Sequence, residues 1–212
     1  NTIREIIALG FPVLLQMGGM SVIFLVVNNC LSRLLTSDWV SAFAYVGKIA
    51  TFFIIPFNAL IQASSPIVSY NFGAKNLSRI SKTLRCCFVT LYAYSAVAVL
   101  IIELVSLQLM SIFTKSDTVI SIGAGALNII SLSAAFLPPI LIFGAYFQAI
   151  GDKKKSVLIN ALLIFVLSVC IVFVSLLDCK RIWLSIPLGC FVVLLPTVVI
   201  FKKNGISHSN FT

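Results

Sequence analysis

Charged residues are scarce in this sequence, and acidic residues are the scarcest of them. Of the 212 residues only 10% are charged, with six Asp or Glu against 15 Lys or Arg, and there is a single histidine. Soluble domains carry about 25% charged residues. With 60% hydrophobic residues, a soluble fold of this length has too few polar side chains to cover its surface. The composition therefore indicates a membrane protein, most of whose surface contacts lipid.

The sequence also lacks the patterns on which catalysis, metal binding and nucleic-acid binding depend. The one histidine, His208, lies near the C-terminus, and there is no glycine-rich phosphate loop or nucleophile elbow. The six cysteines show no Cys-x-x-Cys or Cys/His ligand spacing. The net charge of +9 comes from short basic clusters between uncharged runs, without a recognisable nucleic-acid motif. We therefore expect no enzyme activity, metal, cofactor or nucleic-acid partner.

Six long apolar runs occupy most of the chain. A bilayer core about 30 Å thick needs roughly 20 apolar residues in a helix, and none of the runs alternates in the manner of a barrel strand. The sequence thus predicts an all-α membrane protein, with a six-helix transmembrane bundle over residues 1–203 and a polar tail at 204–212. The predicted spans are 11–35, 39–70, 86–112, 119–150, 157–177 and 182–201.

The second and fourth runs exceed the length that a bilayer requires by about ten residues. Both contain proline, Pro56 in the second and Pro138-Pro139 in the fourth. Proline removes a backbone donor and bends a helix, and neighbouring groups in a membrane protein re-satisfy the freed carbonyl. We expect long helices kinked at these prolines, not additional spans.

Basic residues are divided unequally between the two sets of loops, by more than two to one. The richer set is Arg4, Lys75, Arg79, Lys82, Arg85, Lys153, Lys154, Lys155, Lys202 and Lys203, and the poorer set is Arg33, Lys115, Lys180 and Arg181. Cytoplasmic loops carry the excess of Lys and Arg. The sequence therefore predicts a multi-pass protein of the plasma (bacterial inner) membrane with both termini in the cytoplasm.

A few polar side chains interrupt the apolar runs, where they are costly and often functional. The candidates for a substrate path are Gln16, Asn28, Asn29, Lys48, Asn58, Gln62 and Gln148. Lys48, Asn58 and Gln62 fall within about 40° of a common helical face. Lys48 either faces a cavity or extends its stem to the outer interface. For any single amide, hydrogen bonding between helices is the simpler interpretation.

Acidic residues are expected only in loops and near the ends of the runs. Glu103 is about 25 Å along its helix from Cys86, which predicts a position near the outer interface. Cation-driven transporters commonly use an acid within the membrane as the coupling site. The sequence therefore offers no deeply placed coupling acid.

Several segments resemble the multidrug and toxic-compound extrusion (MATE) transporters. The strongest match ends the second span and resembles that family's proline, aromatic-Asn-aromatic-Gly-Ala-Lys-Asn signature. Its residues are Pro66, Tyr70, Asn71, Gly73, Ala74 and Lys75, and Gly73 is expected to permit the tight turn after the span. Weaker matches are Phe147–Gly151, Gly10–Pro12 with Gln16, and Trp183–Leu188.

The resemblance covers essentially the whole chain and corresponds to the second six-helix lobe of a twelve-helix transporter. It implies an exporter that alternates between inward-facing and outward-facing states around a cavity between two lobes. The implied substrates are amphipathic organic cations, driven out by inward flow of Na⁺ or H⁺. Lys48, Asn58 and Gln62 would then face the cavity, and Pro56 with Pro138-Pro139 would bend during the rocking motion. The chain starts at Asn1, and we expect an N-terminal lobe as its partner.

The sequence departs from the family where some members carry acids. No acid stands near Gln16, near Pro138-Pro139 or soon after Pro187, so a coupling acid is expected in the other lobe. Two alternatives stay open. One is a lipid-linked oligosaccharide flippase of the same superfamily, which usually has a more cationic cavity than Lys48 provides. The other is a half-transporter fragment that does not transport.

Overall fold

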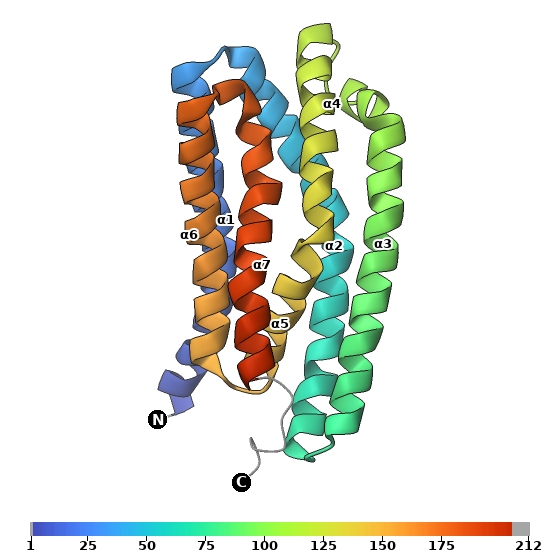
Figure 1. Ribbon diagram of the computed structural model, residues 1–212, viewed down its shortest axis with the longest axis vertical. Coiled ribbons are helices and arrows are strands. Elements are labelled where there is room, and N and C mark those ends of the chain that lie inside the picture. Colours follow the sequence, from blue (N-terminus) through green and yellow to red (C-terminus); the bar gives the residue numbers. More distant parts are fainter. Residues whose placement is uncertain (1, 205–212) are drawn as a thin grey trace.

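The computed structural model describes residues 2–204, although several side chains of the first helix, including that of Gln16, lie outside the description. The regular secondary structure of this part of the chain is entirely helical (Figure 1). The α-helices are α1 Thr2–Leu34, α2 Ser37–Gly73, α3 Leu77–Ser111, α4 Asp117–Ser131, α5 Leu137–Ala149, α6 Lys153–Leu177 and α7 Ser185–Asn204, and two short 3₁₀ helices are η1 Leu132–Ala135 and η2 Cys179–Leu184. The predicted all-α class is confirmed for these residues. The tail with His208 lies outside them.

Five helical segments are long and apolar enough to cross a bilayer. They are Ser37–Gly73, Leu77–Ser111, Asp117–Ala135, Lys153–Leu177 and Cys179–Lys203. Two shorter apolar helices cover Ser21–Arg33 in α1 and Leu137–Ala149 in α5. Only part of the first predicted span is described with its side chains, and the fourth predicted span is divided between two α-helices. The count of six crossings therefore stays a prediction.

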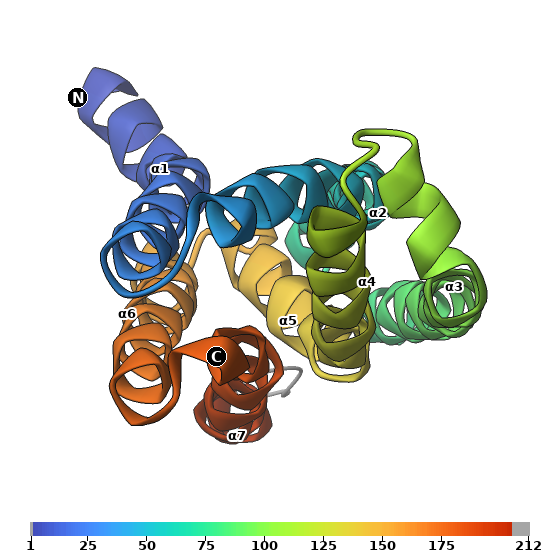
Figure 2. The same cartoon turned by 90° about the horizontal axis from the view of Figure 1, so that it is seen from above.

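The helices form two groups that α5 connects. One group is α1, α6 and α7, and the other is α2, α3 and α4 (Figure 2). Helix α5 packs against α2 and α3 in one group and against α6 and α7 in the other. Helices α1 and α2 meet near their connection, where the rings of Phe24 and Phe43 lie 4.9 Å apart. From there α2 runs away from α1 toward α3 (Figures 1 and 2).

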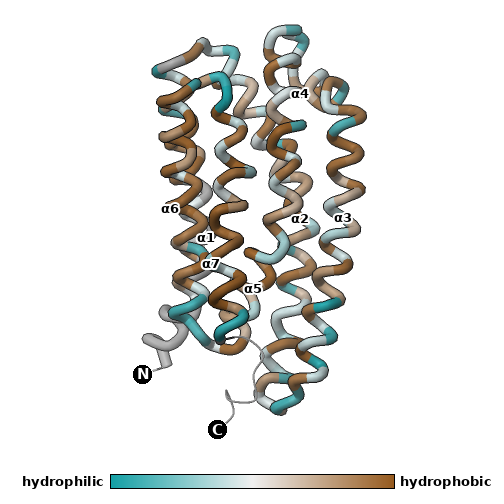
Figure 3. Tube along the Cα trace, in the orientation of Figure 1, coloured by the Kyte–Doolittle hydropathy of each residue, from teal (hydrophilic) through white to brown (hydrophobic). Residues whose placement is uncertain are grey.

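The described ends of the chain lie at the same end of the bundle, together with the α2–α3 and α5–α6 turns (Figure 1). Hydrophobic residues occupy most of the middle of the helices, and hydrophilic residues lie mainly toward the two ends (Figure 3). Lys75 and the Lys153–Lys155 cluster therefore share one end, and Arg33, Lys115 and Lys180 share the other. This grouping matches the predicted loops, while the side of the membrane that each end faces stays a prediction.

The two predicted spans that contain these prolines differ in structure. Helix α2 continues through Pro56 as one α-helix. The fourth run instead changes from α4 through η1 to α5, which begins with Pro138-Pro139 in its first turn. A proline fits that position because first-turn N–H groups have no helical acceptor. The functional bends predicted at these prolines stay predictions. Helix α3 has an unpredicted interruption at Val105, with φ −127° and ψ 20°.

Candidate functional site

Helix α2 exposes a row of side chains that includes most of its polar candidates. Lys48 and Gln62 are exposed, Asn58 is half-buried, and Pro56 is exposed between them. On the opposite face Phe57 is buried, with its ring 5.6 Å from the ring of Tyr94 in α3. A rise of 1.5 Å per residue puts Lys48 and Gln62 about 21 Å apart along the helix. The row is thus too long for one small molecule to contact both ends.

Aromatic rings direct Lys48 toward one end of the bundle. Its Nζ lies 5.8 Å from the ring centre of Tyr45 and 6.0 Å from that of Phe113. Phe113 follows α3 at the end opposite the chain termini. Ammonium groups at such distances are attracted to the ring faces. The lysine therefore points away from Asn58 and Gln62.

The other candidates come from α1 and α5. Asn28 and Asn29 are exposed, and Asn29 Nδ2 donates to the carbonyl of Leu25 at 3.0 Å within α1. Gln16 lies in α1, but its side chain is outside the description. Gln148 is half-buried in the last turns of α5. Among the described side chains, no hydrogen bond joins two of the candidates, so they line helices and do not form one compact cluster.

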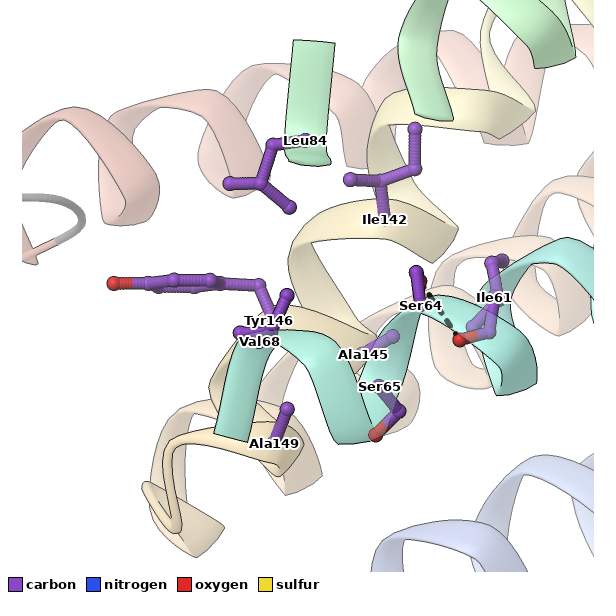
Figure 4. A pocket seen from close by; sticks show the side chains of 9 residues that line it. All are labelled: Ile61, Ser64, Ser65, Val68, Leu84, Ile142, Ala145, Tyr146 and Ala149. Carbon is purple, nitrogen blue, oxygen red and sulfur yellow. Dashed lines mark hydrogen bonds between the residues drawn. The ribbon is translucent and has the colours of Figure 1, made fainter. Parts of the chain in front are cut away.

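A narrow crevice lies between α2, α3 and α5 (Figure 4). Its volume is about 10 Å³, and its lining is Ile61, Ser64, Ser65, Val68, Leu84, Ile142, Ala145, Tyr146 and Ala149. The Ser64 hydroxyl donates to the carbonyl of Ile61 at 2.9 Å, and Tyr146 Oη is buried with no recorded partner. A space of this size holds about one water molecule. The crevice is therefore too small for an organic molecule.

A wider hollow opens at the α5–α6 turn. It measures about 520 Å³ and is lined by Phe72, Ile150, Gly151, Asp152, Lys153, Lys154 and Lys155. Asp152 caps α6 by accepting from the backbone N–H of Lys155, and it also forms an ion pair with that lysine. Gly151 has φ 81°, a value that favours glycine. The basic cluster is therefore attached to a turn of defined shape.

The MatE family model matches residues 12–174 of the chain. The chain belongs to the MatE family. The resemblance seen in the sequence is thereby confirmed, and the MatE chain is assigned to a family of multi-pass membrane transporters. No curated protein matches it.

Solved transporters share the fold of this MatE chain. One of them is a MOP superfamily transporter from Pyrococcus furiosus, whose binding pocket is described as reversed in polarity. Its TM-score is 0.89 at 20% sequence identity, and the match covers 100% of this chain and 48% of that protein. An outward-facing multidrug resistance MATE family transporter gives 0.86 at 19% identity, covering 95% and 46%. MATE in complex with MaL6 gives 0.87 at 18% identity, again covering 95% and 46%. The MatE chain thus spans about half the length of these proteins.

The MatE signature forms the end of α2 and the turn after it. Asn71 is buried, and its Nδ2 donates to the carbonyl of Ile67 at 2.8 Å. Gly73 remains helical, and the residue in the left-handed region is Lys75, with φ 55°. The expectation that Gly73 makes the turn was therefore wrong. The remaining signature residues, Pro66, Tyr70 and Ala74, are exposed.

Two tyrosines of α3 were not among the predicted site residues, yet both donate to backbone carbonyls near prolines. Tyr94 Oη donates to the carbonyl of Phe53 at 3.0 Å, three residues before Pro56. Tyr92 Oη donates to the carbonyl of Ala135 at 3.3 Å. Ala135 precedes Pro139 by four residues, so that carbonyl has no helical donor. The sequence contains no signal for these two hydrogen bonds, because donor and acceptor are 41 residues apart for Tyr94 and 43 for Tyr92.

Replacing either tyrosine of this MatE chain with phenylalanine tests these bridges. Tyr92→Phe and Tyr94→Phe are each expected to lower the free energy of unfolding by about 1 kcal/mol, the contribution of one hydrogen bond. The measurement is thermal unfolding of the purified protein in detergent. Tyr70→Phe, at a 78% exposed position, is the matched control. Equal stability of all three variants would show that the bridges contribute nothing.

Proposed function

We propose that this chain is the C-terminal lobe of a cation-coupled antiporter that exports amphipathic organic cations from the cytoplasm. The observation that carries the proposal is the match of 95% of the chain to about half of a multidrug resistance MATE family transporter, at a TM-score of 0.86. A lobe of this kind needs a second lobe to enclose a transport path. The exposed row of α2 is the surface that we assign to that path.

The composition of the α2 row suits an amphipathic cation. Phe52 and Tyr70 are 70% and 78% exposed, and their 18-residue separation places them on the same side of an α-helix. Gln62 lies between them and can accept a hydrogen bond through its amide oxygen. Aromatic faces attract organic cations without an acidic partner. Phe52 and Tyr70 lie about 27 Å apart along the helix, so one small molecule contacts one ring and not both. In this proposal Gln62 and the half-buried Asn58 orient the substrate, and one of the two rings covers its apolar part.

Lys48 has a different role in the proposal. Its contacts with Tyr45 and Phe113 support an anchor at the outer interface, because a long apolar stem lets the ammonium reach the headgroup region. This leaves the row near Gln62 without a positive charge that would repel a cationic substrate. It also weakens the flippase alternative, for which a cationic cavity is expected.

An accumulation assay with ethidium tests the exporter. Cells that express the complete two-lobe transporter are expected to retain less dye than cells with an empty vector. Gln62→Ala is expected to lower the initial efflux rate about five- to tenfold, the loss expected for one ordinary hydrogen bond of about 1 kcal/mol. Gln108→Ala, the same change at another exposed glutamine, on α3, serves as the control with wild-type efflux.

Other outcomes separate the alternatives. Unchanged dye levels in expressing cells would remove the exporter proposal. Retention of lipid-linked oligosaccharide on the cytoplasmic side after gene deletion would support the flippase. An absence of both effects would support a lobe that does not transport. The dependence of efflux on an imposed Na⁺ or H⁺ gradient identifies the coupling ion.

A further inference from the structure

The hollow at the α5–α6 turn lies where the hydrophobic part of the bundle ends. The turn and the first residues of α6 are hydrophilic, whereas α6 is mostly hydrophobic beyond its first turn (Figure 3). In a membrane protein this boundary meets the lipid headgroups. The hollow measures about 520 Å³, within the range of sites for small molecules. None of the substrate-path candidates with described side chains lines it.

The lining of this hollow carries more positive than negative charge. Three consecutive lysines, Lys153–Lys155, accompany a single carboxylate, that of Asp152. Asp152 forms its ion pair with Lys155, whose ammonium also lies 5.4 Å from the ring centre of Phe147. Lys154 is exposed, and neither recorded ion pair includes it. The hollow therefore presents an excess of positive charge, which attracts an anionic ligand.

Backbone hydrogen bonds fix the shape of the turn that carries these lysines. The N–H of Gly151 donates to the carbonyl of Gln148 at 3.1 Å, and the N–H of Lys153 donates to the carbonyl of Gly151 at 2.9 Å. Asp152 caps α6 through the N–H of Lys155, so the lysines begin a 25-residue helix. The first turn of such a helix adds partial positive charge. Because the backbone of the cluster is ordered before binding, less binding free energy is lost in ordering the site.

Apolar residues beside the lysines indicate the kind of anion. Phe72, near the end of α2, and Ile150 are half-buried and line the same hollow. A free phosphate ion has no apolar part to place against them, whereas a phospholipid has glycerol and acyl carbons next to its phosphate. Basic pockets between membrane helices bind anionic lipid headgroups in other proteins. The hollow therefore fits a phospholipid better than a soluble anion.

The two ends of the bundle differ in how their basic residues are balanced. Asp152 is the one acid with a described side chain at the end that holds the hollow. At the opposite end Asp117 accompanies Lys115, and Asp178 forms an ion pair with Arg181. Unbalanced positive charge at a membrane surface attracts anionic lipids. Such lipids are therefore expected to concentrate at the end where the hollow opens.

We infer that the hollow at the α5–α6 turn is a binding site for the headgroup of an anionic phospholipid. Lys154 contacts the phosphate, and Lys153 and Lys155 add positive charge beside it. Phe72 and Ile150 contact the carbons next to the phosphate. The site depends neither on the side of the membrane that this end faces nor on transport, so it goes beyond the proposed function.

Native mass spectrometry of the delipidated, complete transporter measures lipid binding directly. The probes are dioleoylphosphatidylglycerol, dioleoylphosphatidylcholine and glycerol 3-phosphate. Phosphatidylglycerol is expected to bind at least tenfold more tightly than phosphatidylcholine, which has the same acyl chains but no net charge. Glycerol 3-phosphate, which lacks the acyl chains, is expected not to compete. Equal affinities for the two lipids, or competition by glycerol 3-phosphate at the same concentration, would overturn the lipid site.

Charge changes test whether the lipid binds in the hollow. Lys154→Gln is expected to weaken phosphatidylglycerol binding about fivefold, the effect of one lysine near an anionic headgroup. Asp152→Asn keeps a side-chain oxygen that can cap α6, and it is expected to strengthen binding, because a negative charge leaves the lining.

Lys82→Gln is the matched control, since it removes one exposed lysine on α3 at the same end of the bundle. It is expected to bind phosphatidylglycerol as the wild type does. Equal weakening by Lys82→Gln and Lys154→Gln would mean that the lipid is attracted to the whole end, and the site would be overturned. Weaker binding in Asp152→Asn would also overturn it, because recognition by charge requires the opposite sign.

Discussion

Replacing Trp183 with alanine is expected to lower the free energy of unfolding by about 3–5 kcal/mol, the usual cost of deleting a large buried aromatic side chain. Trp183 is 3% exposed. Its indole is stacked 6.0 Å from that of Trp39 and 6.1 Å from the ring of Phe43. Trp183 belongs to η2, whereas Trp39 and Phe43 belong to the start of α2. The residue therefore joins the two helix groups at the end of the bundle opposite the chain termini.

Thermal unfolding in detergent measures this effect. For a chain of this size a loss of 3–5 kcal/mol corresponds to a midpoint lower by roughly 6–20 °C. Phe173→Ala removes an aromatic side chain that is 60% exposed on α6, and it is expected to shift the midpoint far less. If both variants unfold at the same temperature, the packing of Trp183 against α2 does not stabilise this end of the bundle.

Adjacent glycines of α1 are expected to respond in opposite directions to alanine. A Cβ at Gly19 would overlap the side chain of Ile164 in α6, whereas a Cβ at Gly18 has no atom within 4 Å. Gly19→Ala is expected to cost about 1–3 kcal/mol, because the added methyl forces the close α1–α6 packing apart. Gly18→Ala is expected to be neutral or to stabilise the helix by up to about 1 kcal/mol, since alanine has the higher helix propensity.

The two variants differ only in which of two neighbouring residues changes, so each is the control for the other. Unfolding midpoints in the same detergent measure the difference, and the elution volume of the purified protein reports any loss of compactness. A Gly19→Ala protein as stable as wild type would mean that Ile164 adopts another rotamer without cost. A destabilised Gly18→Ala protein would place an unseen neighbour against that face of α1.

Long uncharged runs were sufficient to predict an all-helical membrane protein, because the length and hydropathy of a spanning helix are set by the bilayer. The signature from Pro66 to Lys75 was sufficient to predict the family, which the match over residues 12–174 confirms. The sequence identified the polar candidate residues but not their positions relative to one another in space. The direction of Lys48, for example, depends on Phe113 in the α3–α4 connection, and nothing in the hydropathy of either segment relates the two.

The sequence by itself determined that this protein lies in a membrane, that it is helical and which family it belongs to. These properties follow from composition, from the length of the apolar runs and from a contiguous motif. Only the tertiary structure decided that Tyr92 and Tyr94 donate to backbone carbonyls near prolines, that Gly19 and not Gly18 is packed, and that Ser131 contacts Glu103. Each of these depends on the rotation and crossing of helices about their neighbours. Rotation is set by packing between segments far apart in the chain, and a run of apolar residues carries no record of it.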